Sequence, residues 1–357
     1  MSLSRYPITI SANVAPDLRA WLLTRTEGNA APRTVVLCDT NTEAIARSLM
    51  TEIGTSEDDV LYITIPSGEV HKNLATAEHI WCKMLEAGID RRAIMLNIGG
   101  GVVGDIGGFC AATYKRGIAF VQIPTTLLAQ VDASVGGKVA VDVGGIKNSV
   151  GVFCEPEAVF ISTNSLATLS ARELRSGFAE MVKHALIADA AMWETMHATT
   201  DFRSLITPHF IEANVAIKAR IVARDFKEQA ERQVLNFGHT FGHSFEAALL
   251  TTPHAITHGE AVAAGMVCEA FVAGRVGRIT QAQLHTITRY VLHIFGKIQL
   301  AGAGIDPAQL IALMANDKKN THNTVNLVLL EGIGAATFGN ATDEDLLRDA
   351  LAYYEAL

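Results

Sequence analysis

The amino-acid sequence predicts an α/β plus α fold: an N-terminal Rossmann-like domain with a mostly parallel sheet, followed by a C-terminal, mainly helical domain. Its 357 residues suffice for two domains, at roughly 100 to 200 residues each. Up to residue 165, short apolar runs alternate with helical patterns, and beyond it helical spacing dominates. We therefore expect domains over residues 1–165 and 166–357, with an active site in the cleft between them.

The expected strands of the first domain are short and continuously apolar. They cover residues 34–39, 60–65, 93–98 and 119–123, and helical patterns fill the gaps at Asn41–Met50 and Leu74–Ala87. Continuous apolar runs, in contrast to alternating ones, are typical of parallel strands that helices cover on both faces. These elements predict a nucleotide-binding type of α/β domain.

The second half has helix start signals and one expected strand. Ser170 with Glu173, and Thr257 with Glu260, match the capping box, in which two side chains satisfy free backbone N–H groups at a helix start. An apolar pattern at helical spacing follows each pair. The β-branched run at 324–330 is the strand expected in this half.

Composition favours a globular protein without a nucleic-acid surface. Apolar residues make up 49% of the chain and charged residues 18%, below the typical value of about 25%, so a disordered chain is excluded. The formal charge is −8 and no cluster of Lys and Arg occurs, whereas binding to nucleic acid needs a basic face. An anionic small-molecule ligand must therefore be held by a few local cations.

The cysteines and the N-terminal segment indicate a cytoplasmic protein. Five cysteines stand far apart without a CxxC pair, so neither a disulfide framework nor a cysteine zinc site is predicted. The opening residues MSLSRYPITI do not resemble a signal peptide, and no uncharged apolar run reaches the length of about 18 residues that a membrane span needs. We expect free thiols and no membrane contact.

A glycine-rich turn follows the apolar run at 93–98. Gly99, Gly101 and Gly104 match GxGxxG where a helix can begin, and free N–H groups at a helix start can bind a pyrophosphate. The acidic residue expected about 20 positions later is missing, but Asp39 at the end of another strand could bind the ribose. A tight turn without a ligand is the alternative.

Residues with metal-ligand chemistry gather in the helical half. His239 and His243 are four residues apart and share one helix face, and HGE follows at 258–260. Two imidazoles and a carboxylate can hold a divalent metal and leave a position for a substrate oxygen. His239, His258 and Glu180 therefore form a plausible set.

Other assignments of these residues stay open at this point. His184 and His254 are competing ligands that spacing does not exclude. A histidine in a helix is commonly a hydrogen-bonded core residue, and Glu180 can pair with Lys183 one turn later.

Two lysines occur in glycine-rich surroundings. Lys138 and Lys147 lie in GGKVAVDVGGIKNSVG, where a lysine can serve as a point charge for phosphate, and a solvated loop is the alternative. Further cations could complete a pocket: Arg116, Lys183, Lys218, Arg232, Lys318 and Lys319.

Seven segments, in one order and over nearly the whole chain, resemble the 3-dehydroquinate synthase family. They are GGGVVGD, PTTLLAQVDASVGGK, GIKN, SGFAEMVKH, LNFGHTFGH, HGEAVAAGM and NDKKN. The resemblance implies conversion of 3-deoxy-D-arabino-heptulosonate 7-phosphate into 3-dehydroquinate and phosphate, a step of the shikimate pathway. In the family, NAD oxidises the C5 hydroxyl, phosphate leaves by β-elimination, NADH returns the hydride, and an intramolecular aldol reaction closes the ring.

By this resemblance the metal, zinc or cobalt, is bound by Glu180, His239 and His258, the set that ligand chemistry also favours. His243 matches a residue that contacts the substrate and relays a proton. The other matched substrate positions are Asp132, Lys138, Asn148, Lys183, Lys218, Arg232, Asn236 and one lysine of the pair 318/319, for which we take Lys318. Arg116 matches a residue that reaches the substrate phosphate from a partner subunit, so the resemblance implies a homodimer.

The resemblance also assigns NAD contacts. Those near the adenosine ribose are Asp39, Asn41, Glu69 and Lys72, and those at the pyrophosphate turn are Gly100, Gly101 and Asp105. Thr125, Thr126, Lys138, Lys147 and Thr168 complete the set.

Three other classes of protein compete with this interpretation. Other sugar phosphate cyclases use substrates without a carboxylate, so the carboxylate-binding candidates Arg232 and Asn236 disfavour them. Iron-type alcohol and glycerol dehydrogenases usually begin their metal set with Asp, where this chain has Glu180. A regulatory protein without catalysis would be indicated by broken ligand positions, and here the positions are intact.

Overall fold

The computed structural model describes residues 4–25, 32–56, 59–144, 146–250, 252–315 and 325–357. The chain forms two compact units, the first from Met1–Ser170 with Thr207–Ala223, and the second from Ala171–Ile206 with Arg224–Leu357. The first stretch of the first unit ends at Ser170, and the second unit begins at Ala171. Helix α7 (Pro208–Arg224) also packs with the first unit, although it comes from the half of the sequence expected to form the second.

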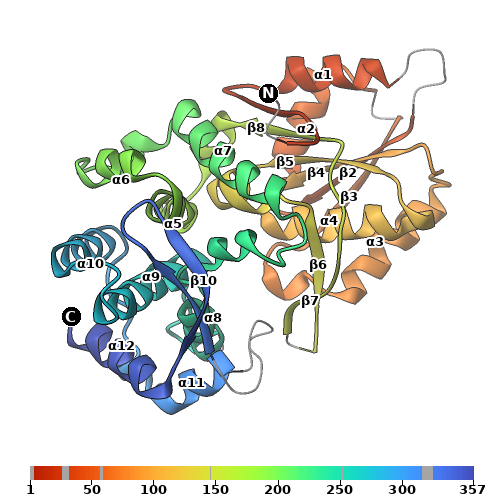
Figure 1. The fold of residues 1–357 in the computed structure, drawn as a ribbon. Coiled ribbons are helices and arrows are strands. Elements are labelled where there is room, and N and C mark those ends of the chain that lie inside the picture. The colour runs from red at the N-terminus through yellow and green to blue at the C-terminus, as the bar shows by residue number, and fades with distance from the viewer. Residues whose placement is uncertain (1–3, 26–31, 57–58, 145, 251, 316–324) are drawn as a thin grey trace. The chain divides into compact units, whose positions relative to one another are not determined.

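A six-stranded sheet forms the centre of the first unit, in the order β1-β8-β5-β4-β2-β3 (Figure 1). Every neighbouring pair is parallel, which confirms the expected sheet. The strands are β1 (Ile8–Ser11), β2 (Thr34–Asp39), β3 (Val60–Ile65), β4 (Ile94–Gly99), β5 (Ala119–Pro124) and β8 (Ala158–Ser162). β1 and β8 were not expected from the sequence.

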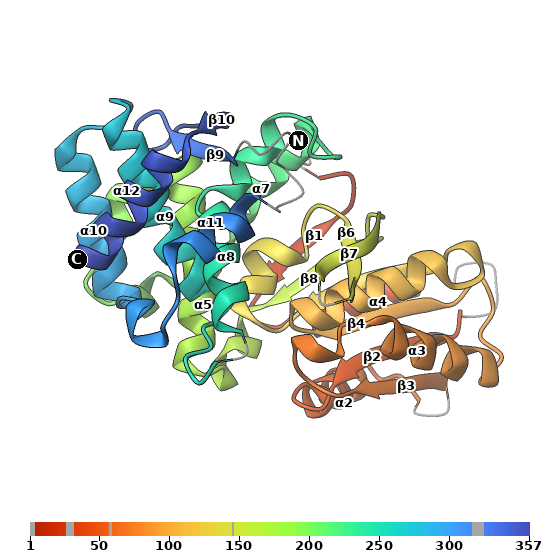
Figure 2. The same ribbon diagram turned by 90° about the horizontal axis from the view of Figure 1, so that it is seen from below.

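Helices cover both faces of this sheet (Figure 2). On one face, α1 (Ala15–Thr24) and α2 (Glu43–Glu52) bury a core with strand residues such as Val36 and Leu96. On the other face, α3 (Leu74–Glu86) and α4 (Gly101–Thr113) bury a second core around Leu37. The strand residues are apolar on both faces because both faces are buried.

The glycine-rich segment with the two lysines forms an antiparallel hairpin. β6 (Lys138–Val143) pairs with β7 (Ile146–Phe153), so Lys138 and Lys147 lie in strands and not in an irregular loop. Val139 and Val141 of β6 join the core beside α4. β7, by contrast, is largely exposed.

The second unit is mainly helical, as expected. Its longer helices are α5 (Ala171–Ala188), α6 (Ala190–His197), α8 (His239–Leu249), α9 (His258–Arg275), α10 (Gln281–Phe295), α11 (Pro307–Ala315) and α12 (Glu344–Ala356). The expected strand is β9 (Val325–Leu330), and it pairs with the unexpected β10 (Ala336–Thr342) in an antiparallel hairpin. The expected capping box of Thr257 and Glu260 starts α9. No helix in the described ranges has the length and apolar content needed to cross a bilayer.

Short helical turns connect the longer elements. They are η2 (Glu69–His71), η3 (Tyr114–Arg116), η4 (Ala129–Ala133), η5 (Thr163–Thr168), η6 (Phe202–Leu205), η7 (Glu231–Asn236) and η8 (Ala301–Ala303). Several of them carry residues of the candidate site.

Glycines let α8 and α9 approach each other closely. A Cβ atom added at Gly265 of α9 would lie 1.9 Å from the carbonyl oxygen of Gly238 and 2.8 Å from the backbone nitrogen of Gly242. Gly238 also has a φ of 79°, in the left-handed region that favours glycine. The glycines of the GHTFGH and HGEAVAAGM segments therefore have a packing role.

We predict that Gly265→Ala lowers the free energy of unfolding by about 1–3 kcal/mol or more, because the new methyl group would overlap backbone atoms that cannot move separately. Urea unfolding followed by circular dichroism measures the change. Gly274→Ala in the same helix is the matched control, since its nearest neighbour would be an ordinary 3.4 Å away. Alanine also favours a helix over glycine by about 1 kcal/mol, so the control should keep its stability. Equal unfolding midpoints for the two variants would contradict the proposed packing.

Candidate functional site

Three helices of the second unit bring one carboxylate and two imidazoles together. Glu180 lies in α5 with no exposed surface, His239 is the first residue of α8, and His258 is the first residue of α9. Glu180 Oε1 lies 3.7 Å from His239 Nε2 and 3.7 Å from His258 Nε2. Donor atoms in a tetrahedral zinc site with bonds of about 2.0–2.2 Å are roughly 3.3–3.6 Å apart. The trio therefore has nearly the spacing of a metal site.

Acceptors behind both imidazoles orient these rings. His239 Nδ1 donates to the carbonyl oxygen of Phe237 at 3.1 Å, and His258 Nδ1 donates to Glu246 Oε2 at 3.2 Å. A histidine that donates from Nδ1 presents the lone pair of Nε2, which is the arrangement found in metal sites. Both lone pairs face the Glu180 carboxylate, and such electron-rich atoms need a positive charge among them. The donor set therefore fits a divalent cation.

The electrostatics of the trio support this conclusion. Burial lowers the pKa of His258, but hydrogen bonds with the carboxylates of Glu180 and Glu246 outweigh it and raise the pKa to about 9. Burial, and then the ammonium of Lys183, lower the pKa of His239 well below its usual value. Lys183 is itself buried and forms an ion pair with Glu180. A proton on His258 thus supplies positive charge when no metal is bound.

The remaining histidines differ in position. His243 lies one turn after His239 in α8, and its ring centre is 5.3 Å from that of His239 and 6.0 Å from that of His258. Its side chain is exposed, so it lies beside the trio without belonging to it. The competing candidate His254 is exposed and belongs to no potential metal-binding group among the described residues, and His184 is not a member of this trio.

Sequence reasoning missed Glu246. It lies seven residues after His239 in the same helix, and seven residues is close to two helical turns, so the two share a face. The spacing indicated only that Glu246 lies on the same helix face as His239. The partner of Glu246 is His258 of α9, and only the packing of α8 against α9 creates this contact.

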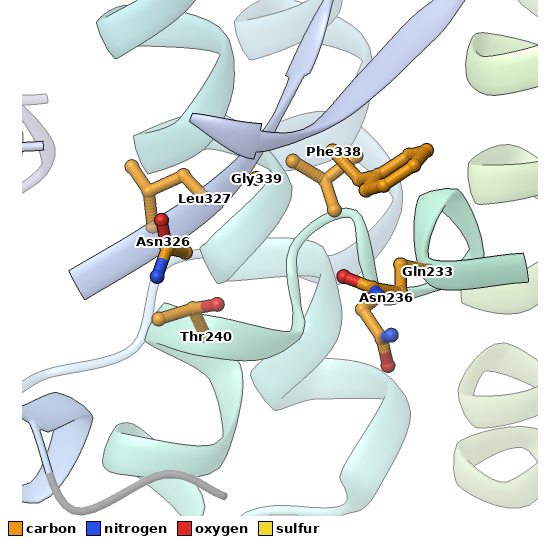
Figure 3. Close-up of a pocket in the computed structure, with 8 residues that line it drawn as sticks. Gln233, Asn236, Thr240, Asn326, Leu327, Phe338 and Gly339 are labelled. Carbon is orange, nitrogen blue, oxygen red and sulfur yellow. The ribbon is translucent and has the colours of Figure 1, made fainter. Parts of the chain in front are cut away.

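Two expected substrate residues lie on the short helix η7. Arg232 is buried, its Nη1 donates to the carbonyl oxygen of Phe226 at 2.6 Å, and Asn236 Nδ2 donates to Glu228 Oε1 at 2.9 Å. Asn236 also lines a pocket between η7, the start of α8 and the β9–β10 hairpin (Figure 3). The expected residue Lys318 and its neighbour Lys319 lie outside the described residues.

In the first unit, α7 carries Lys218 to the turn η4. Lys218 is buried, its Nζ lies 2.7 Å from Asp132 Oδ1, and it donates to the carbonyl oxygen of Asp132 at 2.6 Å. These two expected substrate residues are 86 positions apart in the sequence. The placement of α7 in the first unit brings them together.

A buried lysine connects the β6–β7 hairpin with the sheet domain. Lys72 Nζ lies 2.7 Å from Glu69 Oε1, 3.4 Å from Asp105 Oδ2 and 3.8 Å from Asp142 Oδ1, and it donates to Asn148 Oδ1 at 2.9 Å. Burial lowers the pKa of Lys72, but the carboxylates outweigh it and raise the pKa above its usual value. Burial raises the pKa of Asp105 to about 6. The expected NAD residues Glu69, Lys72 and Asp105 thus form one cluster.

The other NAD candidates follow the carboxyl ends of parallel strands. These are Asp39 at the end of β2 with Asn41 after it, Gly100 and Gly101 after β4, Thr125 and Thr126 after β5, and Thr168 at the end of η5, which follows β8. Strand ends of a parallel sheet meet at one edge, where such folds bind nucleotides. Asp39 Oδ1 accepts hydrogen bonds from the backbone N–H groups of Asn41 and Thr42, at 2.9 Å each.

The glycine motif forms the expected turn between a strand and a helix. β4 ends at Gly99, Gly100 precedes the helix, and α4 begins at Gly101. A Cβ atom at Gly100 would lie 3.1 Å from Thr126 Cγ2, whereas one at Gly101 would have its nearest neighbour at 3.6 Å. The turn is compact and presents the N-terminal N–H groups of α4.

The last three expected residues lie in exposed or partly exposed positions of the first unit. Lys138 starts β6 and is exposed, and Lys147 Nζ lies 3.8 Å from Glu69 Oε1. Arg116 ends η3, is exposed, and has a φ of 70°, directly after Lys115 with a φ of 48°. Two successive non-glycine residues in the left-handed region cost about 1–2 kcal/mol each. Such strain commonly occurs at functional sites.

Comparisons with known proteins identify the family of this chain. The family profiles described as 3-dehydroquinate synthase N-terminal and C-terminal match residues 62–176 and 177–320. The chain is 40% identical to a 3-dehydroquinate synthase of Listeria welshimeri, over 95% of this chain and 92% of that protein.

Solved structures of related cyclases share the fold. A 2-epi-5-epi-valiolone synthase from Streptomyces hygroscopicus with bound NAD+ and Zn2+ matches with a TM-score of 0.85 and 26% identity, over 98% of this chain and 97% of that chain. A 2-deoxy-scyllo-inosose synthase in complex with carbaglucose-6-phosphate, NAD+ and Co2+ matches with a TM-score of 0.83 and 23% identity, over 97% and 96%.

We predict that a divalent metal binds this trio more weakly as the pH falls, by up to about tenfold per pH unit below pH 9. The pKa of His258 is about 9 without metal, so its proton must leave when metal binds at pH 7. Calorimetric titration of the metal-free protein with Co2+, in buffers of different ionisation enthalpy, counts the released protons. About one proton per metal is expected at pH 7. Equal affinities at pH 6 and pH 8 would contradict this assignment.

Proposed function

Because the chain belongs to the 3-dehydroquinate synthase family, we propose that it converts 3-deoxy-D-arabino-heptulosonate 7-phosphate into 3-dehydroquinate and phosphate with NAD and a divalent metal, zinc or cobalt. The trio of buried Glu180, buried His239 and partly buried His258, with its two oriented imidazoles, is the observation that carries this proposal. The reaction also needs the groups of the first unit, which are proposed to bind NAD and part of the substrate.

The proposed metal ligands are Glu180 and the Nε2 atoms of His239 and His258. When bound, the metal and NAD would supply polarisation of a hydroxyl oxygen and acceptance of a hydride. Exposed His243, one turn from His239, would accept the hydroxyl proton and pass it towards solvent. Lys183, buried beside Glu180, would donate to a substrate oxygen as negative charge develops there.

The charged ends of the substrate require cations and hydrogen-bond donors. We assign the carboxylate to Arg232 and Asn236, whose N–H groups suit a planar anion. The remaining proposed substrate residues are Asp132, Lys138, Asn148, Lys218, Arg116 and Lys318. Because an oxygen of the leaving phosphate can take the proton from the neighbouring carbon, these residues need only orient the substrate and stabilise its charge.

The proposed NAD site lies at the carboxyl edge of the parallel sheet. The N–H groups at the start of α4, reached through Gly100 and Gly101, would bind the pyrophosphate. Asp39 uses Oδ1 to cap its own turn, so Oδ2 would bind the ribose. Asn41, Thr125, Thr126, Lys138, Lys147, Thr168 and the cluster around Lys72, with Glu69 and Asp105, would complete the site.

We further propose that the protein acts as a homodimer in the cytoplasm. Ile146, Val150, Val152 and Phe153 of β7 are between 40% and 58% exposed, an apolar row along a strand edge that a second copy would cover. Arg116 is exposed on a strained backbone, which is consistent with a contact outside its own chain.

Purified protein treated with a chelator and supplied with NAD should release no phosphate from the heptulosonate phosphate. Addition of Zn2+ or Co2+ should restore phosphate release. Mass spectrometry of the product separates this reaction from that of cyclases whose substrates have no carboxylate. His258→Ala should lose metal and activity, because two ligands hold a metal much less tightly than three, whereas His254→Ala, an exposed histidine nearby, should keep both. Full phosphate release by metal-free protein would refute the proposed metal role.

Mixed dimers test whether Arg116 acts across an interface. Arg116→Ala and Lys183→Ala chains, inactive alone, should together recover about a quarter of the wild-type activity, because half of randomly paired dimers contain one intact site of two. Differently tagged chains expressed together allow the mixed dimer to be purified, and this dimer alone should have about half of the wild-type activity.

A mixture of two variants whose substitutions both lie in the second unit is the control for the Arg116→Ala and Lys183→Ala mixture. His239→Ala with Lys183→Ala should recover nothing, since each site then lacks one group of its own chain. The absence of recovery with Arg116→Ala would show that this arginine does not act across subunits.

A further inference from the structure

A buried carboxylate outside the ligand trio lies behind the start of α8. Glu269 of α9 has no exposed surface, and it accepts hydrogen bonds from two backbone N–H groups. Gly238 donates to Glu269 Oε2 at 2.9 Å, and Thr240 donates to Glu269 Oε1 at 3.3 Å. These two N–H groups flank His239 in the sequence. The carboxylate therefore holds the backbone on both sides of a proposed metal ligand.

The local sequence of α9 makes this contact possible. Gly265 and Glu269 are four residues apart and share one helix face. Gly265 lets the backbone of Gly238 approach α9, and Glu269 then reaches the N–H of the same residue one turn later. Gly238 has no side chain that could cap α8, so a carboxylate from another helix does so.

Because His239 is the first residue of α8, a cation bound to it would be repelled by the positive end of the helix dipole, and Glu269 offsets this repulsion. The N-terminal end of a helix carries a partial positive charge of about half a unit, which repels a cation bound to its first residue. His239 is the first residue of α8, so a divalent metal on its Nε2 would lie near that end. The negative charge of Glu269 on the same N–H groups offsets this repulsion.

We infer that Glu269 is a positioning residue for the metal: its carboxylate fixes the backbone around His239 and neutralises the start of α8, so that a divalent cation binds tightly there. The inference rests on the proposed metal-dependent function. It adds a requirement for a residue that touches neither the metal nor the substrate.

Glu269→Gln tests the inference because glutamine has nearly the same shape but no charge. The amide oxygen of glutamine can accept a hydrogen bond from one of the two backbone N–H groups. The amide NH2 would face the other N–H group, and two donors cannot form a hydrogen bond with each other. Co2+ affinity, measured by competition with a chromogenic chelator, should fall about 10- to 100-fold, as for other groups that support metal ligands from outside. The visible absorption spectrum of bound Co2+ should also change, because His239 loses its fixed position.

Glu260→Gln is the matched control at the start of α9, the helix that carries His258. Glu260 forms a partly exposed ion pair with Arg172 at 2.7 Å, and glutamine can keep its capping box. Its Co2+ affinity should change by at most about fivefold, the range of an exposed ion pair.

Three outcomes are distinguishable. A folded Glu269→Gln protein with lower melting temperature but wild-type Co2+ affinity and spectrum would mean that Glu269 only stabilises the fold, and would overturn the inference. If Glu269→Gln does not fold, Glu269→Asp keeps the charge but shortens the side chain, and an unchanged affinity there would also overturn it. Wild-type protein that does not bind Co2+ would instead refute the proposed function.

Discussion

The burial of three electron-rich donors against one another is the constraint on which the second unit depends. Glu180 Oε1 lies 3.7 Å from each of two imidazole Nε2 atoms in a largely buried region, and such groups repel unless a cation or proton lies among them. The surrounding structure meets this constraint with acceptors behind both rings, a buried lysine, and a carboxylate at the start of α8. The metal-site geometry is thus built from several layers of contacts, and each layer involves a different helix.

The first unit follows a different physical rule. Its parallel strands end at one edge, and several of the residues proposed to contact NAD, such as Asn41, Gly100 and Thr125, lie just after these ends. The cluster around Lys72 then joins the β6–β7 hairpin to this edge, because a buried ammonium requires several carboxylates near it. The hairpin is positioned mainly by this ionic cluster and by Val139 and Val141 in the core.

Much of this arrangement could be predicted from local sequence. The apolar runs at 34–39 and 60–65 are the strands β2 and β3 to the residue, and the capping box of Thr257 and Glu260 starts α9. The edge strand β1 and the strand β8 were not predicted, because each is a short run of only four or five residues. The hairpin of β6 and β7 was not predicted, because its sequence is rich in glycine and glycine is more typical of loops than of strands.

The sequence alone determined which residue types were available, where several strands lie and where a few helices such as α9 begin, because capping and apolar periodicity act over a few neighbouring residues. Family resemblance then pointed to Glu180, His239 and His258. Only the tertiary structure decided that Lys218 returns to Asp132, that Glu246 supports His258, and that Glu269 holds the backbone around His239. These contacts join residues on separate elements, and their geometry depends on how the helices pack, a property that no local pattern encodes.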